Sequence, residues 1–261
     1  YLSSSFIGGE MSKKTTLILE LKKIQRLVKN LPVLDIRHLK FHKGTIYGVV
    51  GPVGSGKSSL LNILSGSVKP DKGSILYDYE PFKKNFLGRT QIPKDVTYVN
   101  SEKSYNSTVK SLFSKSNASQ VLSNYFSNLS TDKILNTGLK QLSAGEVSAV
   151  MLSLGIESDP RVLIIDDYAL HYDNKMENKF RKKLVNINKD HGTTIILGSP
   201  NEQVLRSFCS VLIYLDNGHI SKIRTGSHNS NRINKHRSQR FKKNNSHRPK
   251  SGYRGKNAKP R

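Results

Sequence analysis

The chain has 261 residues and carries 43 lysine and arginine residues against 19 aspartate and glutamate residues, a formal net charge of +24. Only 35% of the residues are hydrophobic, and no apolar run approaches the roughly 18 residues that a membrane-spanning helix needs. The single cysteine, Cys209, excludes a disulfide framework and a thiolate metal site, and the eight histidines show no metal-ligand spacing.

The positive charge is concentrated towards the C-terminal end. Residues 222–261 hold 14 of the 43 basic side chains, no acidic residue and only five apolar residues. Such a segment cannot bury enough apolar surface to order itself, so we expect residues 225–261 to form a basic disordered tail. Its composition suits RNA, a ribosomal surface or anionic lipid headgroups, and a solubilising tail without a dedicated partner is the remaining alternative. Residues 1–15 are expected to be an N-terminal extension, of which residues 1–10 do not resemble a signal peptide.

In chain order, short apolar runs alternate with helical patterns, which is typical of an α/β protein with a largely parallel sheet. Asn217-Gly218 predicts a two-residue hairpin turn, and therefore a late antiparallel strand at 219–223. A region rich in serine and asparagine at about 102–141 predicts a small helical insertion. The other strands are predicted at residues 16–21, 46–50, 96–99, 162–166, 193–197 and 211–215. Apolar positions with helical spacing predict two core-facing helices, one with Val147, Val150, Met151 and Leu154 and one with Met176, Phe180, Leu184 and Ile187.

The most specific motif directly follows the strand predicted at 46–50. Residues 51–58 read Gly-Pro-Val-Gly-Ser-Gly-Lys-Ser and fit the pattern G-x-x-x-x-G-K-[ST], with a helical pattern following at 58–64. Glycines let such a loop curl so that its backbone N–H groups face a phosphate, and the positive end of the helix strengthens the attraction. The motif predicts a di- or triphosphate site in which Lys57 contacts the β- and γ-phosphates and Ser58 binds Mg²⁺. The nucleotide-binding residues expected here are Gly51, Gly54, Ser55, Gly56, Lys57, Ser58 and Ser59.

Two further motifs narrow the class of nucleotide-binding protein. Leu142-Ser143-Ala144-Gly145-Glu146 opens a helix, and an apolar strand ends in Asp166-Asp167, 23 residues after Ser143. With these motifs in this order, residues 16–224 resemble the ATP-binding cassette (ABC) ATPases. The resemblance implies an α/β P-loop fold of ABC type, with a mostly parallel core sheet, an antiparallel β part and a small helical subdomain at about 102–141. It also implies ATP and Mg²⁺ as cofactors, Ser58 and Asp166 as metal ligands, and Ser143 and Gly145 as contacts to the nucleotide of a facing subunit.

The sequence departs from the family pattern at positions that the family uses for hydrolysis. Asp167 replaces the glutamate that activates water, Ser101 replaces the glutamine that follows the strand at 96–99, and Ser199 replaces the switch histidine. Because phosphoryl transfer depends on positioned groups, losing one costs on the order of 10²–10³ in rate. We therefore predict MgATP binding with slow hydrolysis, and ordinary ATPase activity with Asp167 as an adequate substitute is the alternative.

Three other positions bear on how a nucleotide is held. Glu146 replaces the glutamine of the signature motif and adds negative charge near the facing γ-phosphate. Residues 23–33 lack the aromatic ring that stacks on adenine in the family, which leaves Leu27 or Val28 for apolar contact. Asp173 matches the family's D-loop aspartate.

The resemblance also implies partners. In the family each ATP lies between the P-loop of one subunit and the signature motif of another, so a second ABC subunit, identical or different, is expected. The predicted function is the ATP-binding subunit of a membrane transporter, whose membrane subunit would dock on the insertion at about 102–141. One alternative is a soluble nucleotide-dependent switch that acts on RNA or the ribosome through the basic tail. Another is a scaffold subunit that binds ATP without hydrolysing it. The expected location is the cytoplasm, including attachment to the inner face of a membrane.

Overall fold

The computed structural model describes residues 16–87, 90–100, 107–113, 118–126 and 131–226. In this part of the chain a six-stranded sheet has the order β10-β9-β3-β8-β7-β6. Strands β6, β7, β8, β3 and β9 are parallel, and β10 adds an antiparallel edge. The strands are β3 Ile46–Val50, β6 Val96–Val99, β7 Val162–Ile165, β8 Thr194–Ser199, β9 Val211–Asp216 and β10 His219–Thr225.

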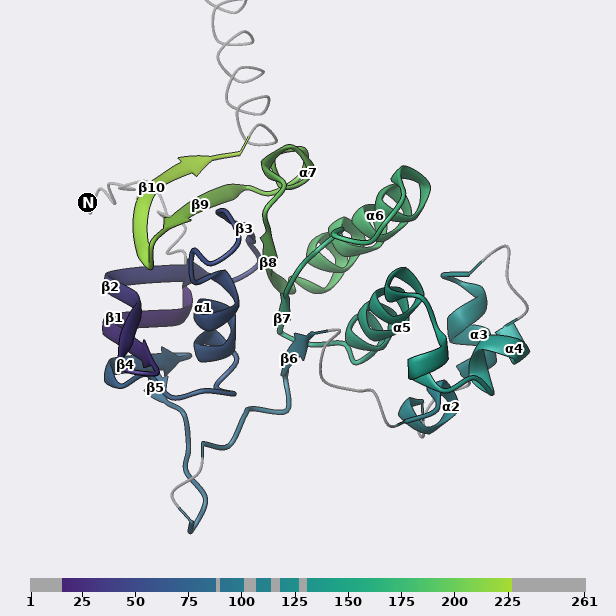
Figure 1. The fold of residues 1–261 in the computed structure, drawn as a ribbon, viewed down its shortest axis with the longest axis horizontal. Coiled ribbons are helices and arrows are strands. Elements are labelled where there is room, and N and C mark those ends of the chain that lie inside the picture. Colours follow the sequence, from purple (N-terminus) through teal and green to yellow (C-terminus); the bar gives the residue numbers. More distant parts are fainter. Residues whose placement is uncertain (1–15, 88–89, 101–106, 114–117, 127–130, 227–261) are drawn as a thin grey trace, which may run out of the picture.

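A second, antiparallel sheet has the order β2-β1-β4-β5 and lies on the side of the molecule where α1 (Lys57–Leu64) is found (Figure 1). Its strands are β1 Leu17–Val28, β2 Leu31–His42, β4 Lys72–Tyr77 and β5 Glu80–Pro81. The predicted fold class, a mostly parallel core sheet with an antiparallel β part, is therefore confirmed.

Successive residues of the parallel strands point into two different cores, as the alternation of a β-strand requires. Val49 and Ile164 pack with α1 and the antiparallel sheet, whereas Val50 and Ile165 pack with α5, α6 and α7. Helices α1 and α5 therefore cover opposite faces of one sheet. The helices on the second face are α5 Ala144–Glu157, α6 Asn174–His191 and α7 Glu202–Arg206.

The predicted helical insertion is also found in the described residues. Three short helices lie beyond α5, at the end of the molecule opposite the antiparallel sheet (Figure 1). Buried side chains in and next to these helices include Val109, Phe113, Leu122 and Tyr125. These helices are α2 Val109–Leu112, α3 Ala118–Ser123 and α4 Thr131–Leu135, followed by a 3-10 turn at Leu139–Gln141.

The predicted strands at 46–50 and 96–99 match β3 and β6 residue for residue. The strand predicted at 16–21 is too short, since β1 continues to Val28, and the other predicted strands differ by one or two residues at their ends. The Asn217-Gly218 turn is confirmed, with φ angles of 45° and 80° that suit a tight hairpin. The sequence analysis did not assign strands to 31–42 or 72–77. In β2 the buried positions run Leu34, Ile36 and then Leu39, so the alternation breaks and the period-2 signal is lost.

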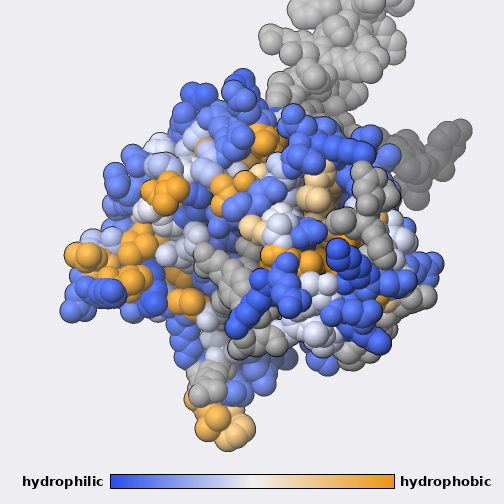
Figure 2. Space-filling view, turned by 45° about the vertical axis from the view of Figure 1, so that its right-hand side comes forward, coloured by the Kyte–Doolittle hydropathy of each residue, from blue (hydrophilic) through white to orange (hydrophobic). Residues whose placement is uncertain are grey.

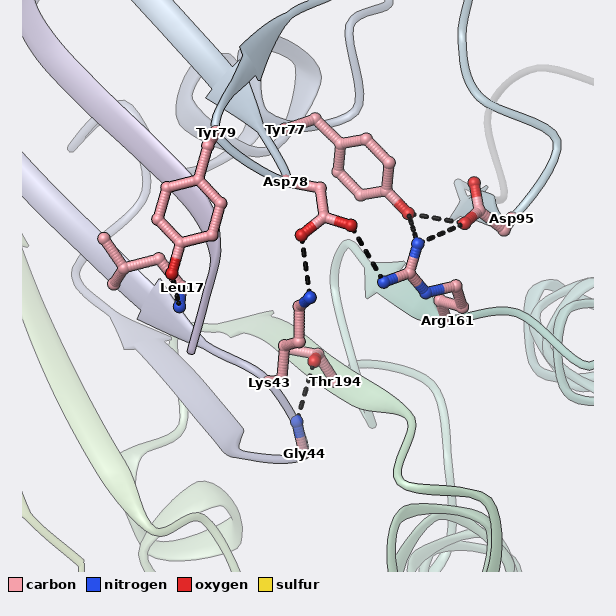
Figure 3. Close-up of polar contacts among 9 residues, drawn as sticks. All are labelled: Leu17, Lys43, Gly44, Tyr77, Asp78, Tyr79, Asp95, Arg161 and Thr194. Carbon is pink, nitrogen blue, oxygen red and sulfur yellow. Dashed lines mark hydrogen bonds and ion pairs between the residues drawn. The ribbon is translucent and has the colours of Figure 1, made fainter. Parts of the chain in front are cut away.

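A polar network ties the antiparallel sheet to the amino ends of the parallel strands (Figure 3). Asp78, which follows β4, accepts from Lys43 Nζ at 2.7 Å and from Arg161 Nη2 at 3.2 Å. Arg161, which precedes β7, also pairs with Asp95 at 3.2 Å, and Tyr77 Oη donates to Asp95 at 2.6 Å. The network lies at the end of the sheet formed by the amino ends of the parallel strands, opposite their carboxyl ends.

The face shown in Figure 2 is largely hydrophilic, with hydrophobic residues at the left, in scattered places towards the centre and at the tip of the segment that projects at the bottom. That projection lies between β5 and β6, and Phe86 within it is 95% exposed. None of the helices in the described ranges is long and apolar enough to cross a membrane.

Candidate functional site

The loop between β3 and α1 makes a tight curl that depends on its glycines. Gly54 and Gly56 have φ angles of 82° and 96°, in the left-handed region that side chains with a Cβ rarely adopt. A Cβ at Gly51 would lie 2.3 Å from the carbonyl oxygen of Leu215, so only glycine fits there. Helix α1 begins at Lys57 without a side-chain cap, and the first N–H groups of a helix have no partner within it. The loop and the helix start therefore present donors to an anion.

Ser55 supplies an independent sign that this loop is built for a ligand. Its side chain is buried, and its Oγ has no hydrogen-bond partner among the described residues. A buried hydroxyl without a partner costs free energy, which a ligand oxygen that accepts from it would recover. The cradle and its unpaired donor thus fit a phosphate group.

Lys57 is buried at the first position of α1. Its Nζ donates to the carbonyl oxygens of Gly51 and Pro52, both at 2.7 Å, so the ammonium lies over the loop. Burial lowers the pKa of the Lys57 ammonium, and the carboxylates of Asp167 and Asp166 oppose that shift. Lys57 is therefore a positive charge held between the loop and two carboxylates.

Asp166 follows β7 and lies at the carboxyl end of the sheet, next to the loop. Burial raises the pKa of its carboxyl group, while a hydrogen bond from Ser58 lowers it and the negative charge of Asp167 raises it. Gly198 on the neighbouring strand makes room, since a Cβ there would lie 3.2 Å from Asp166 Oδ1. A carboxylate and a hydroxyl in contact are hard oxygen ligands of the kind Mg²⁺ takes, so the pair fits the expected metal.

Two residues near Asp166 were not singled out from the sequence. Tyr98 Oη donates to Asp166 Oδ2 at 3.3 Å, and Asn100 Nδ2 lies 3.4 Å from Tyr98 Oη. Burial raises the pKa of the Tyr98 phenol, as do the charges of Asp166 and Asp167, so the hydroxyl stays protonated as a donor. Only the pairing of β6 with β7 brings these groups together, and no local motif carries that information.

The three predicted catalytic positions have different surroundings. Asp167 has a φ of 50° and its N–H donates to Asp166 Oδ1 at 3.0 Å, so the backbone turns sharply where β7 ends. Ser199 ends β8 beside Val50, is 1% exposed, and its Oγ accepts from the N–H of Asn201 at 3.2 Å. Ser101 lies outside the described residues. The structure thus brings Asp167 and Ser199 to the carboxyl edge of the sheet near the loop.

The signature residues lie apart from the loop, at the start of α5 on the opposite face of the sheet. Ser143 caps α5, and its N–H and Oγ both donate to Glu146 Oε2 at 2.8 Å, while Glu146 N donates back to Ser143 Oγ at 3.3 Å. Gly145 lies so close to the loop after β7 that a Cβ would come within 2.8 Å of the carbonyl oxygen of His171. Glu146 is therefore tied to the serine of its own motif, a contact that the sequence analysis did not foresee.

The remaining predicted contacts also have definite places. Leu27 and Val28 lie at the tip of the β1–β2 hairpin and are each more than 40% exposed. Asp173 caps α6, where its Oδ1 accepts from the N–H of Met176 at 2.6 Å. In the described residues no group of three or more histidine, cysteine, aspartate or glutamate side chains could hold a metal ion by itself.

A phosphate-binding loop between the parallel strand β3 and a helix, with an aspartate at the end of the parallel strand β7, separated from β3 by β8, defines the class of P-loop nucleoside triphosphatases. The family model for ABC transporters matches residues 34–169, more than half of the 261 residues, so the chain belongs to the ABC transporter family.

Individual relatives agree with this assignment. The chain is 25% identical over 201 residues to the tungstate uptake system ATP-binding protein TupC of Peptoclostridium acidaminophilum, covering 73% of this chain and 90% of TupC. It is 25% identical over 231 residues to the methionine import ATP-binding protein MetN of Chlamydia caviae, covering 82% of this chain and 67% of MetN.

Solved structures show the same fold. The ATP-binding cassette MJ0796, in a dimeric post-hydrolysis state with ADP and Pi, matches with a TM-score of 0.69 at 21% identity, over 80% of this chain and 98% of that one. CbiO1 from Clostridium perfringens, part of the ABC transporter complex cbiONQ, matches with a TM-score of 0.65 at 19% identity, over 80% of this chain and 89% of CbiO1.

Proposed function

We propose that this chain is the ATP-binding subunit of an ABC transporter and that it binds MgATP at the loop of residues 51–58. The observation that carries the proposal is the cradle itself, where the buried Ser55 hydroxyl has no partner among the described residues and the Lys57 ammonium lies over the loop. The further loop contacts we propose are Gly51, Gly54, Gly56, Ser58 and Ser59. Ser58 and Asp166 would hold Mg²⁺, whose charge offsets that of the β- and γ-phosphates when it is bound.

The arrangement of the helices supports a second subunit in the complete site. Helix α1 follows the phosphate-binding loop, whereas α5 begins at the signature motif, and the two pack on opposite faces of the sheet. A nucleotide on the loop would therefore meet Ser143 and Gly145 of another cassette rather than those of its own chain. The second subunit would be either another copy of this chain or a different ABC subunit, and the solved dimer of MJ0796 gives a precedent for pairing.

Slow hydrolysis is the second part of the proposal. The Asp167 carboxylate is one methylene shorter than a glutamate's, and its backbone is fixed at φ 50° by the turn after β7. Ser199 replaces a histidine and therefore has no imidazole to place against a γ-phosphate. Its side chain is buried, and its Oγ accepts from the N–H of Asn201. With Ser101 in the place of a glutamine, three positioning groups differ from the family pattern, and each can cost on the order of 10²–10³ in rate.

Two measurements test binding and hydrolysis separately. Titration calorimetry with MgATP should give a 1:1 complex for the natural chain, and Lys57→Ala should abolish it, because the ammonium is the one buried cation at the described loop. Single-turnover hydrolysis of bound ATP should be slow and should rise at least about tenfold in Asp167→Glu. Brisk hydrolysis by the natural chain, or no gain in Asp167→Glu, would contradict the slow-hydrolysis proposal without touching the binding proposal.

The partners and domain limits belong to the same proposal. We propose a cassette at residues 16–224 with a helical subdomain at about 102–141, on which a membrane transport subunit docks, flanked by residues 1–15 and the basic tail 225–261. Relatives named as ATP-binding proteins of tungstate uptake and methionine import support a transporter role. Co-purification with a polytopic membrane protein, lost when Val109 and Phe113 are replaced together by alanine to loosen the helical insertion, is the corresponding test.

A further inference from the structure

A groove of about 590 Å³ runs along one face of α6, and the described residues that line it are all lysine or asparagine. Its lining residues are Lys175, Asn178, Lys179, Lys182, Lys183 and Asn186. They recur at three- and four-residue intervals, so they form one stripe along the helix. From Lys175 to Lys183 the helix rises about 12 Å, and four ammonium groups fall within that length.

No carboxylate in the described ranges neutralises these four lysines. The carboxylate of Glu177 pairs instead with Arg181 at 3.5 Å and accepts from Tyr168 Oη, on another side of α6. Burial lowers the pKa of the Lys179 ammonium, and the positive charges of Lys183 and Lys175 lower it further. The groove is thus a concentrated positive field that a nearby anion would stabilise.

Contacts with Tyr125, two residues after the end of α3, hold part of this stripe in place. Lys179 Nζ donates to the carbonyl oxygen of Tyr125 at 2.9 Å, and Lys183 Nζ lies 5.5 Å from the centre of the Tyr125 ring. Tyr125 is itself fixed, because its ring stacks on Phe180 and its hydroxyl donates to Glu157 at 2.8 Å. Two of the four cations are therefore partly pre-organised, which lowers the entropy cost of binding an anion.

The chemistry of the lining separates the classes of polyanion. Lysine is depleted in protein–protein interfaces, where aromatic residues and arginine supply most of the binding energy, and neither type is found among the described lining residues. Attachment to a bilayer requires apolar side chains that insert below the headgroups, and none of the lining residues that the structure describes is apolar. Ammonium point charges with amide donors between them suit the regularly spaced phosphates of a nucleic acid.

We propose that the α6 groove binds the phosphodiester backbone of a nucleic acid, independently of base sequence. The Tyr125 ring beside it is buried and cannot stack on a base, so the contacts would be to phosphates alone. The proposal does not rest on ATP binding at the loop of residues 51–58, and it concerns the folded domain rather than the tail.

The test measures binding of the full chain to a labelled 20-nucleotide RNA and to a duplex DNA of the same length, by fluorescence anisotropy between 50 and 200 mM salt. The variant replaces Lys175, Lys179, Lys182 and Lys183 together by glutamine. Each lost phosphate contact lowers the slope of log affinity against log salt by about 0.7 on a single strand, so a fall of about 2 to 3 is expected. The control variant removes the same charge from scattered exposed positions by replacing Lys29, Lys72, Lys84 and Lys133 by glutamine.

The control should change the slope by less than about 1. If the fourfold variant has a lowered melting temperature, the double variant Lys175→Gln and Lys182→Gln replaces it, since both side chains are exposed, with an expected fall of about 1 to 1.5. Equal changes in the α6 and control variants, or no binding to either nucleic acid, would overturn the proposal. So would a variant that keeps its nucleic-acid slope but loses binding to phosphatidylglycerol vesicles.

Discussion

Glu146→Gln probes the link between a helix cap and the proposed composite ATP site. In the structure Glu146 Oε2 accepts from both the N–H and the Oγ of Ser143 at 2.8 Å. The hydroxyl hydrogen of Ser143 is therefore directed at a carboxylate of its own helix. A γ-phosphate presented by a second subunit would have to compete with that carboxylate for the same hydrogen and would also meet its negative charge.

The size of the effect follows from these contacts. Helix N-caps contribute about 1 kcal/mol, and a carboxylate in the first turn adds about 0.3–1 kcal/mol through the helix dipole. The substituted glutamine side chain would keep the geometry of the cap but lose its charge, so the free energy of unfolding should fall by about 1 kcal/mol and the melting temperature by about 2–4 °C. A neutral amide oxygen accepts more weakly than a carboxylate, so the Ser143 hydroxyl can turn to the phosphate and form a charge-assisted hydrogen bond, worth about 1.5 kcal/mol, or about tenfold in affinity for each composite site.

One substitution should therefore lower stability and strengthen ATP-dependent dimerisation. Sedimentation with and without MgATP measures the second effect, and thermal unfolding measures the first. Glu177→Gln is the matched control, because it removes a first-turn carboxylate from α6 and should lower stability without changing the dimer. If Glu146→Gln left dimerisation unchanged or weakened it, Ser143 would not be withheld by Glu146, and the reasoning would be refuted.

Two further substitutions test other parts of the molecule. Ser55→Ala removes a buried hydroxyl that has no partner in the described residues, so it should raise the free energy of unfolding by about 1 kcal/mol while lowering ATP affinity by about tenfold. A fall in stability together with unchanged ATP affinity, by calorimetry, would argue against a ligand role for Ser55. Asp78→Asn should lower stability by about 1 kcal/mol at pH 5–8, because the hydrogen bond from Lys43 holds the pKa of Asp78 below its usual range. A carboxylate with a lowered pKa stabilises the fold at pH values above its usual pKa near 3.9, and this effect is lost as the pH falls. The melting temperatures of the natural chain and of Asp78→Asn should therefore converge in acid, and a difference that stays constant with pH would contradict this.

The phosphate-binding loop could be predicted from the sequence because its requirements are local. Gly54 and Gly56 need positive φ angles, Lys57 must start a helix, and the preceding strand must end at the loop, all within about 12 residues. The hairpin at Asn217-Gly218 was predictable for the same reason. In both cases the residue types that satisfy the backbone geometry lie next to one another in the chain.

The antiparallel sheet was harder to predict because its strands are irregular. Lys23 has a φ of 52° in the middle of β1, and the pairing with β4 shifts register between Lys22 and Gln25. This irregularity moves the buried residues from the alternation of Leu19 and Leu21 to Ile24, so a search for period 2 ends the strand too early. Pairing with two neighbouring strands, which the sequence does not reveal, stabilises the rest of β1.

Two contacts at the candidate site were not predicted, for two different reasons. Ser143 and Glu146 have the S-x-x-E spacing of a capping box, so their mutual hydrogen bonds could have been predicted from the sequence, but the motif was interpreted only as a signature. The contact of Tyr98 with Asp166 could not be predicted from the sequence, because it joins residues 68 positions apart through the pairing of β6 with β7. Hydrogen bonds between strands that are distant in sequence need the sheet order, which local patterns do not contain.

The proposed ATP site and the α6 groove are joined by the short segment 166–173. Tyr168 N–H donates to the carbonyl oxygen of Gly198 at 2.8 Å, and Asp173 caps the start of α6, so both ends of this segment are fixed to the core. The carbonyl oxygen of His171 within it lies so close to Gly145, at the start of α5, that a Cβ there would come within 2.8 Å of it. A change at the signature motif would therefore reach α6 by moving a packed backbone segment, not a flexible linker. Because coupling between two binding sites is reciprocal, any effect of ATP on nucleic-acid affinity must be matched by an equal effect of nucleic acid on ATP affinity, with this segment as its physical route.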